Sequence, residues 1–259
     1  ECGWSTSKWV GRCGECQAWG SIDEGTRKLN VVAAGAVTAT ARPIGEVDLA
    51  AAQSRSSGVA ELDRTLGGGL VPGAVVLLAG EPGVGKSTLL LTVAAESART
   101  GLTALYVTGE ESTAQVRLRA ERLSAIHPSL WLAAENELSA VVAHIDAVKP
   151  DLLIIDSIQT MASAAIEGSP GGVTQVREVA NTAIRIAKDR GITVILVGHV
   201  TKDGSIAGPR LLEHLVDVVL NFEGDRHSRL RLVRSIKNRF GATDEVGCFD
   251  LHDGGISGV

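Results

Sequence analysis

The chain has 259 residues, a formal net charge of −5 and a hydrophobic content of 44%, enough for one large domain and a small appendage. The negative charge excludes a protein that coats nucleic acid by bulk attraction, and no apolar stretch approaches the roughly 18 residues of a membrane span. The first residues show no signal-peptide pattern, so we expect a cytoplasmic protein whose four cysteines are metal ligands or core residues.

Residues 1–25 differ from the rest because they hold three of the four cysteines and three of the four tryptophans. Cys13 and Cys16 flank a tight turn that can grip one tetrahedral Zn²⁺, and Cys2 supplies a third thiolate. A fourth is expected three positions before Cys2, so we interpret the segment as a partial four-cysteine zinc ribbon that lacks its first cysteine and holds the metal less firmly. Free cysteines or a redox pair are the alternatives. Cys248 lies in an apolar strand-like run and is expected in the core.

Residues 26–57 are rich in Ala, Val, Ser and Thr and predict a linker. From residue 58 to 259, apolar runs alternate with helical patterns, which predicts an α/β domain with a mostly parallel sheet and right-handed crossovers. The expected strands are Ala74–Ala79, Ala104–Thr108, Leu152–Ile155, Thr193–Val197 and Val216–Leu220, with helices at Leu89–Thr100 and around Val176–Ala187. Arg229–Ile236 and Val246–Leu251, separated by a turn at Lys237–Gly241, are expected to form antiparallel edge strands.

A glycine-rich segment between the first strand and the next helix has the sequence of a phosphate-binding loop. Its residues are Gly80, Glu81, Pro82, Gly83, Val84, Gly85, Lys86, Ser87 and Thr88. The glycines let backbone N–H groups turn toward phosphate oxygens, and the helix N-terminus adds positive potential. We expect Lys86 to reach the β- and γ-phosphates of a nucleoside triphosphate and Ser87 to ligate Mg²⁺. The strand–loop–helix order argues against the alternative, a glycine turn with a chance lysine.

Further polar side chains follow the other expected strands at their carboxyl ends, the edge where the phosphate loop lies. Asp156 provides a carboxylate for Mg²⁺. Glu110 is favoured over Glu111 as the group that orients or deprotonates the attacking water; a solvated loop carboxylate is the alternative. His199 either senses the γ-phosphate or is an ordinary structural histidine, and the residues alone leave both interpretations open.

On these motifs the chain resembles the bacterial RadA (Sms) family of DNA repair ATPases, which belongs to the RecA superfamily and is similar to DnaB-type helicases. The resemblance covers almost the whole chain, and its motifs are the cysteine ribbon, Gly67–Leu70, Gly80–Thr88, Tyr106–Ser112, Asp156–Thr160 and, most specific of all, Lys237–Gly241. It implies a RecA-like P-loop core flanked by helices. It also implies an ATP-driven motor that assembles as a homo-hexamer on single-stranded DNA and promotes branch migration of recombination intermediates, with the RecA recombinase as a partner.

The resemblance further implies roles for particular residues. Lys237 and Arg239 would act on the phosphates of a neighbouring subunit, as an arginine finger does, the alternative being a solvated basic turn. The implied DNA-facing loops are Met161–Thr174 and Lys202–Pro209, with Lys202, Arg210 and Arg177 as the cations nearest DNA. Members of the family carry a C-terminal Lon-protease-like domain, and this sequence stops before it.

Two rival functions follow from the same motifs. The main rival is an ATP-binding regulatory ring of the RecA superfamily that acts on protein partners without moving along DNA. The other is a structural zinc module with an inactive nucleotide site, which the presence of Lys86, Asp156 and Glu110 disfavours.

Overall fold

The computed structural model describes residues 2–8, 10–20, 37, 40–49, 52–199, 212–225 and 227–259. The chain divides into two compact units, Glu1–Val47 and Asp48–Val259. The described part of the smaller unit contains an antiparallel bridge between Arg12 and Trp19 and a short 3-10 turn, η1 (Ile44–Glu46). All elements that carry the phosphate loop and the expected nucleotide site belong to the larger unit.

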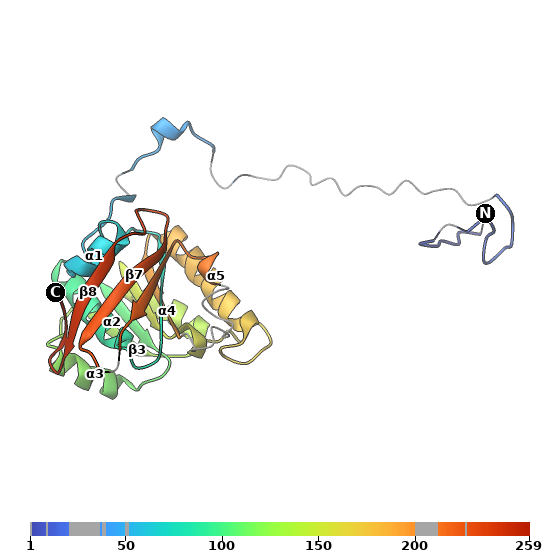
Figure 1. Cartoon of the computed structure of the whole chain (residues 1–259). Helices are drawn as coiled ribbons and strands as arrows, with labels where there is room; N and C mark the ends of the chain where they lie inside the picture. Colours follow the sequence, from blue (N-terminus) through green and yellow to red (C-terminus); the bar gives the residue numbers. More distant parts are fainter. Residues whose placement is uncertain are drawn as a thin grey trace. The chain divides into compact units, whose positions relative to one another are not determined.

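The larger unit alternates helices and strands along most of its length (Figure 1). In chain order its elements are α1 (Ala60–Leu66), β1 (Val75–Gly80), α2 (Lys86–Arg99), β2 (Ala104–Thr108), α3 (Thr113–Arg122), β3 (Leu130–Ala134), α4 (Leu138–Val148), β4 (Leu152–Asp156), η3 (Ile158–Thr160), α5 (Val173–Arg190), β5 (Thr193–His199), β6 (Val218–Glu223), β7 (Leu230–Asn238), β8 (Val246–His252) and β9 (Gly255–Gly258).

The strands form one sheet in the order β3-β2-β4-β5-β1-β6-β7-β8-β9. Within this order, the neighbours among β3, β2, β4, β5, β1 and β6 pair in parallel. β7, β8 and β9 then pair antiparallel with their neighbours at one side of the sheet. The register brings Thr108 beside Asp156 and Gly80 beside His199, so the carboxyl ends of β2, β4, β1 and β5 meet at one edge. The mostly parallel α/β architecture expected from the sequence is therefore confirmed.

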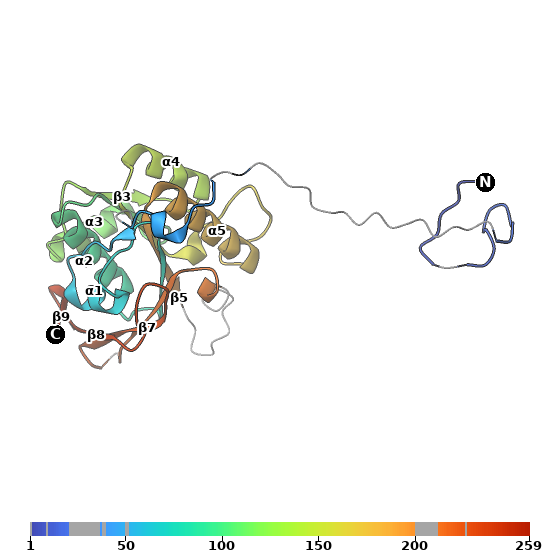
Figure 2. The same ribbon diagram turned by 90° about the horizontal axis from the view of Figure 1, so that it is seen from above.

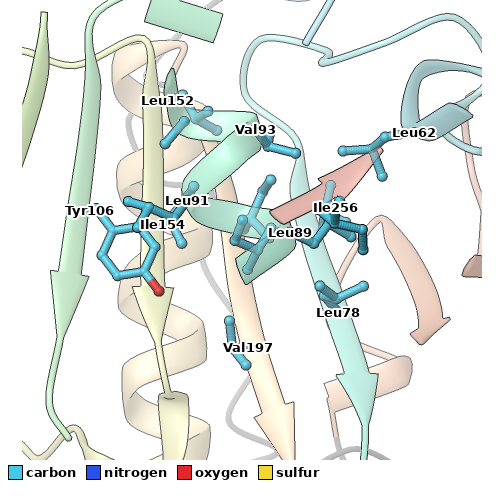
Figure 3. Packing of buried hydrophobic residues seen from close by; sticks show 14 of the residues in the cluster. Leu62, Leu78, Leu89, Leu91, Val93, Tyr106, Leu152, Ile154, Val197 and Ile256 are labelled. Atoms are coloured by element: carbon cyan, nitrogen blue, oxygen red, sulfur yellow. The ribbon is translucent and has the colours of Figure 1, made fainter. Parts of the chain in front are cut away.

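Helices cover both faces of the sheet, and each face has its own apolar core. α1, α2 and α3 pack on one face and α4 and α5 on the other (Figure 2). Leu89 and Leu91 of α2 enter the first core, in which Leu91 lies near Ile154 of β4 and Leu89 near Ile256 of β9 (Figure 3). Strands buried on both faces explain the continuous apolar runs in the sequence.

Some boundaries and elements differ from the sequence-based expectation. The strand expected at Val216–Leu220 begins only at Val218, because the Val216 N–H donates to the carbonyl of Leu212 in a helical turn. β7 continues through Asn238, so Lys237 lies in a strand rather than in a turn. β3, β9 and helices α1, α3 and α4 were not among the elements expected from the sequence.

The expectation that Cys248 is a core residue is only partly met. Cys248 lies in β8 and is half-buried, whereas its neighbours Gly247 and Phe249 are buried. Alternate residues of a strand point to opposite faces, so Phe249 and Gly247 take the inward side.

Candidate functional site

The phosphate loop joins β1 to α2 and depends on three of its glycines. A Cβ at Gly80 would lie 2.4 Å from the carbonyl oxygen of Phe222 on β6. Gly83 and Gly85 have φ angles of +80° and +109°, in the region that side chains other than glycine rarely adopt. The loop therefore keeps its shape only with glycine at these positions, and it ends where Lys86 begins α2.

Lys86 folds back onto the loop. Its Nζ donates to the carbonyl oxygens of Gly80 and Glu81 at 2.7 and 2.8 Å, and only 4% of the residue is exposed. Burial lowers the pKa of Lys86 to about 8, although the charges of Asp156 and Glu110 oppose the shift. The ammonium group thus lies near both carboxylates that the sequence assigned to the site, and its carbonyl partners can be exchanged for phosphate oxygens.

Asp156 ends β4 and is buried beside a tyrosine that the sequence analysis did not assign to the site. The Tyr106 hydroxyl donates to Asp156 Oδ2 at 2.6 Å. Burial first, and then the charge of Asp156, raises the pKa of Tyr106 well above its usual value, so the hydroxyl remains a donor. Figure 3 shows the Tyr106 ring in the core with its oxygen directed toward the carboxyl ends of the strands. It is the single tyrosine of the chain and lies between the apolar Leu105 and Val107, and that signal was available in the sequence.

Glu110 and Glu111 have different partners. Ser157 Oγ donates to Glu110 Oε1 at 2.7 Å, and His199 Nε2 lies 3.2 Å from the same oxygen. Glu111 instead forms an ion pair with Arg119 at 2.5 Å. The structure therefore brings Glu110 and His199 together at the ends of β2 and β5, whereas Glu111 is turned to α3.

Lys237 and Arg239, the expected trans-acting cations, bind groups of their own chain. Lys237 Nζ donates to the carbonyls of Glu213 and Val216, both at 2.7 Å, and burial followed by the charge of Arg239 lowers its pKa. Arg239 donates from Nη1 to Oδ1 of the buried Asp217 at 2.8 Å. Both side chains thus fasten the segment before β6, and their action on a neighbour stays a prediction.

The residues expected near DNA are described only in part. Arg177 is exposed on α5. Lys202, Arg210 and the loop Lys202–Pro209 lie outside the described residues.

The glycine-rich loop Met161–Thr174, one of the two implied DNA-facing loops, is held in its first half by a side chain of α5. The side chain of Gln175 accepts a hydrogen bond from the Ser163 N–H and donates to the carbonyls of Ser163, Ile166 and Gly168. Gln175 itself is buried on α5.

A cavity of about 580 Å³ opens beside the phosphate loop. Gly83, Gly85 and Thr88 form one side, and its other lining residues are Arg122, Leu123, Ser228, Arg229, Arg231, Leu251, His252, Asp253 and Gly255. Its volume lies in the range of sites that bind small molecules.

The three N-terminal cysteines converge. The sulfur atoms of Cys2, Cys13 and Cys16 all lie within 4.8 Å of one another, with 3.4 Å between those of Cys2 and Cys13. A backbone N–H of Trp4, and then Cys13, lowers the pKa of the Cys2 thiol to about 7, which favours the thiolate that binds metal. Three soft sulfur donors at this spacing fit three of the four positions of a tetrahedral Zn²⁺ site.

Comparison with protein families defines the class of protein. Residues 41–205 match the AAA domain family and residues 1–24 match the rubredoxin metal binding domain family. The first match covers more than half of the chain, so the chain belongs to the AAA domain family, and the matched range contains the glycine-rich loop.

Curated relatives narrow the comparison. The chain is similar to the DNA repair protein RadA of Mycolicibacterium smegmatis (56% identity over all of this chain and 58% of the relative) and of Mycobacterium tuberculosis (54%, over all of this chain and 55% of the relative). It is 47% identical to that of Streptococcus pyogenes serotype M6, over 99% of this chain and 57% of the relative. The resemblance to bacterial RadA is confirmed, and the chain spans a little more than half the length of these relatives. Among the described helices, none combines the length and apolarity needed to cross a bilayer.

Proposed function

We propose that this chain binds Mg²⁺·ATP at the phosphate loop and hydrolyses it. The observation that carries the proposal is the meeting of Lys86, Asp156 and Glu110 at one edge of the sheet, where their charges act on one another. The loop supplies N–H donors, Lys86 a cation, Asp156 a buried carboxylate and Glu110 an accessible one. These are the parts that phosphoryl transfer to water requires.

In the binding step, the loop N–H groups and Lys86 hold the phosphates. Lys86 leaves the carbonyls of Gly80 and Glu81 and bonds to phosphate oxygens, which carry more negative charge. Ser87 and Asp156 would hold Mg²⁺, which neutralises charge on the β- and γ-phosphates when bound. Tyr106 fixes the Asp156 carboxylate by holding Oδ2.

In the hydrolytic step, Glu110 orients and deprotonates the attacking water. Ser157 and His199 both hold Oε1, so we assign Oε2 as the oxygen that receives the proton. The Glu110 side chain is 44% exposed, which gives water access to it. In this proposal His199 aligns the general base, Glu110. A contact between His199 and the γ-phosphate would therefore affect the position of Glu110.

For the whole protein we propose a DNA-dependent ATPase of recombinational repair. It would act as a homo-hexameric ring on single-stranded DNA, promote branch migration and cooperate with a RecA recombinase. The similarity to proteins named DNA repair protein RadA supports this, as does the presence of both the cysteine ribbon and Lys237–Gly241. In this ring Lys237 and Arg239 act on the neighbour's phosphates after exchanging their contacts with Val216 and Asp217, and Zn²⁺ stabilises the cysteine unit.

The experiment that tests the site is ATP turnover by Glu110→Gln, with Glu111→Gln as the matched control. We expect turnover to fall by about 10²- to 10⁴-fold in Glu110→Gln with ATP affinity retained, because that variant lacks the general base. Glu111→Gln should keep most of its activity, since Glu111 binds Arg119. Equal losses in both variants would refute the assignment of Glu110.

A second measurement separates the DNA motor from the regulatory ring. Turnover of the wild-type chain is measured with and without single-stranded DNA, together with DNA binding itself. We expect binding and a higher rate with DNA. If DNA neither binds nor changes the rate, the regulatory ring that acts on protein partners is the better interpretation.

A further inference from the structure

A buried arginine supports the phosphate loop from the β6–β7 side. Arg231 points inward from β7, with 6% of the residue exposed. Its Nε donates to the carbonyl oxygen of Val84, within the loop, at 2.8 Å. Its Nη1 donates to three further carbonyls that lie between β6 and β7 or at the start of β7, those of Asp225 (3.1 Å), Ser228 (2.6 Å) and Leu230 (2.9 Å).

The partners of Arg231 are unusual for a buried cation. In the ranges that the structure describes, every recorded hydrogen-bond acceptor of its guanidinium is a backbone carbonyl, and no carboxylate forms an ion pair with it. A buried charge without a counter-charge is unfavourable. Arg231 also lines the cavity beside Gly83 and Gly85. An anion bound at this loop would be attracted by the uncompensated positive charge.

The contact with Val84 also sets the direction of a loop N–H group. The carbonyl of Val84 and the N–H of Gly85 belong to the same peptide unit, and in a trans peptide they point in opposite directions. By holding the Val84 oxygen, Arg231 keeps the Gly85 N–H turned to the opposite side of the loop. With its φ of +109°, Gly85 has a backbone freedom that makes such an external anchor useful.

Gly224 makes room for this arginine. A Cβ at Gly224 would lie 2.3 Å from Cδ and 2.8 Å from Nε of Arg231. The guanidinium is fastened to four carbonyls, so the arginine could yield only by giving up some of these contacts. Gly224 and Arg231 therefore form one unit.

We propose that Arg231 is a positioning residue for the phosphate loop. It holds the Val84–Gly85 peptide in the orientation that binds ATP and ties the loop to the connection between β6 and β7. The inference rests on the proposed function, because it requires that the loop binds ATP.

The test compares ATP affinity, KM and kcat of the folded chain in Arg231→Met, Arg231→Lys and Gly224→Ala. We expect Arg231→Met to weaken ATP binding and raise KM about tenfold or more, because a hydrogen bond from a charged donor to the loop is lost. The kcat at saturating ATP should change far less. Arg231→Lys should recover part of the affinity, and Gly224→Ala should weaken it in the same direction. The double variant should bind no more weakly than Arg231→Met, since both changes disrupt one unit.

Arg234→Met is the matched control. Arg234 lies three residues further along β7, its side chain is 45% exposed, and it pairs with Glu223 at 3.3 Å. The ATP affinity of this control variant should stay within about twofold of the wild-type value, because exposed ion pairs contribute little. Folding of each variant is checked by circular dichroism. If Arg231→Met does not fold, Arg231→Lys and Gly224→Ala decide the question.

The outcomes separate the two proposals. Wild-type chain that binds no ATP would overturn the proposed function itself. If the wild-type chain binds ATP and the folded Arg231 and Gly224 variants have an ATP affinity and KM within about twofold of the wild-type values, only the positioning role is overturned. A fall in kcat with unchanged KM would also overturn it, because the loop would then bind ATP without the arginine.

Discussion

The lowered pKa of Lys86 predicts that ATP binding depends on pH in a range where lysines are normally fully charged. The pKa of Lys86 is about 8 because the side chain is buried, against an ordinary value of 10.5. The charged fraction is then about 0.9 at pH 7, about 0.5 at pH 8 and about 0.1 at pH 9. Only the cation attracts the polyphosphate, so we expect ATP affinity to weaken by about tenfold between pH 7 and pH 9.

The sign follows from the two states of the site. Bound phosphates stabilise the ammonium group and raise its pKa, so ATP binding takes up a proton wherever Lys86 is partly neutral. Uptake should be about half a proton per site at pH 8 and close to none below pH 7. Folding has the opposite dependence. The unfolded chain binds the extra proton between about pH 8 and 10.5, so Lys86 makes the unliganded domain more stable as pH rises through that window.

Isothermal titration calorimetry checks this prediction. ATP is titrated at pH 7, 8 and 9 in buffers that differ in ionisation enthalpy, which gives affinity and proton uptake together. The control is Lys86→Ala, in which the uptake near pH 8 should disappear along with most of the affinity. Wild-type affinity that is flat from pH 7 to 9, with no proton uptake at pH 8, would refute the reasoning.

Two further predictions concern other parts of the chain. Tyr106→Phe should lower the free energy of unfolding by roughly 1.5–3 kcal/mol, because it removes a 2.6 Å hydrogen bond to the buried Asp156 carboxylate. Urea unfolding measures this free energy, and a change below about 0.5 kcal/mol would contradict the prediction. Cys13→Ser should remove bound zinc, measured by atomic absorption, because it takes away one of three convergent sulfur donors, while Cys248→Ser should leave the zinc content unchanged. Equal zinc content in both variants would place the metal elsewhere.

Much of the candidate nucleotide site could be predicted from the sequence because its signals are local. The loop glycines and Lys86 follow an apolar run directly, and Asp156 ends another. Parallel strands bring their carboxyl ends to one edge, so each polar residue that follows an apolar run could be assigned to that edge before the strand order was known.

The choice between Glu110 and Glu111 shows where local signals end. The two residues are adjacent, and each donates its N–H to the Thr108 hydroxyl. Their side chains are separated by partners from other elements, Ser157 and His199 for one and Arg119 for the other. The sequence could favour Glu110 as the general base, and the structure shows how the surroundings of Glu110 and Glu111 differ.

The sequence by itself determined the α/β architecture, the phosphate loop and the cysteine cluster, because each is encoded by residue types at short spacing. Only the tertiary structure decided that Tyr106 holds Asp156, that Arg231 supports Val84, and that Lys237 and Arg239 fasten the segment before β6. These contacts join residues 21 to 147 positions apart. Which side chains meet at such separations depends on strand order, register and packing, and a local pattern does not contain them.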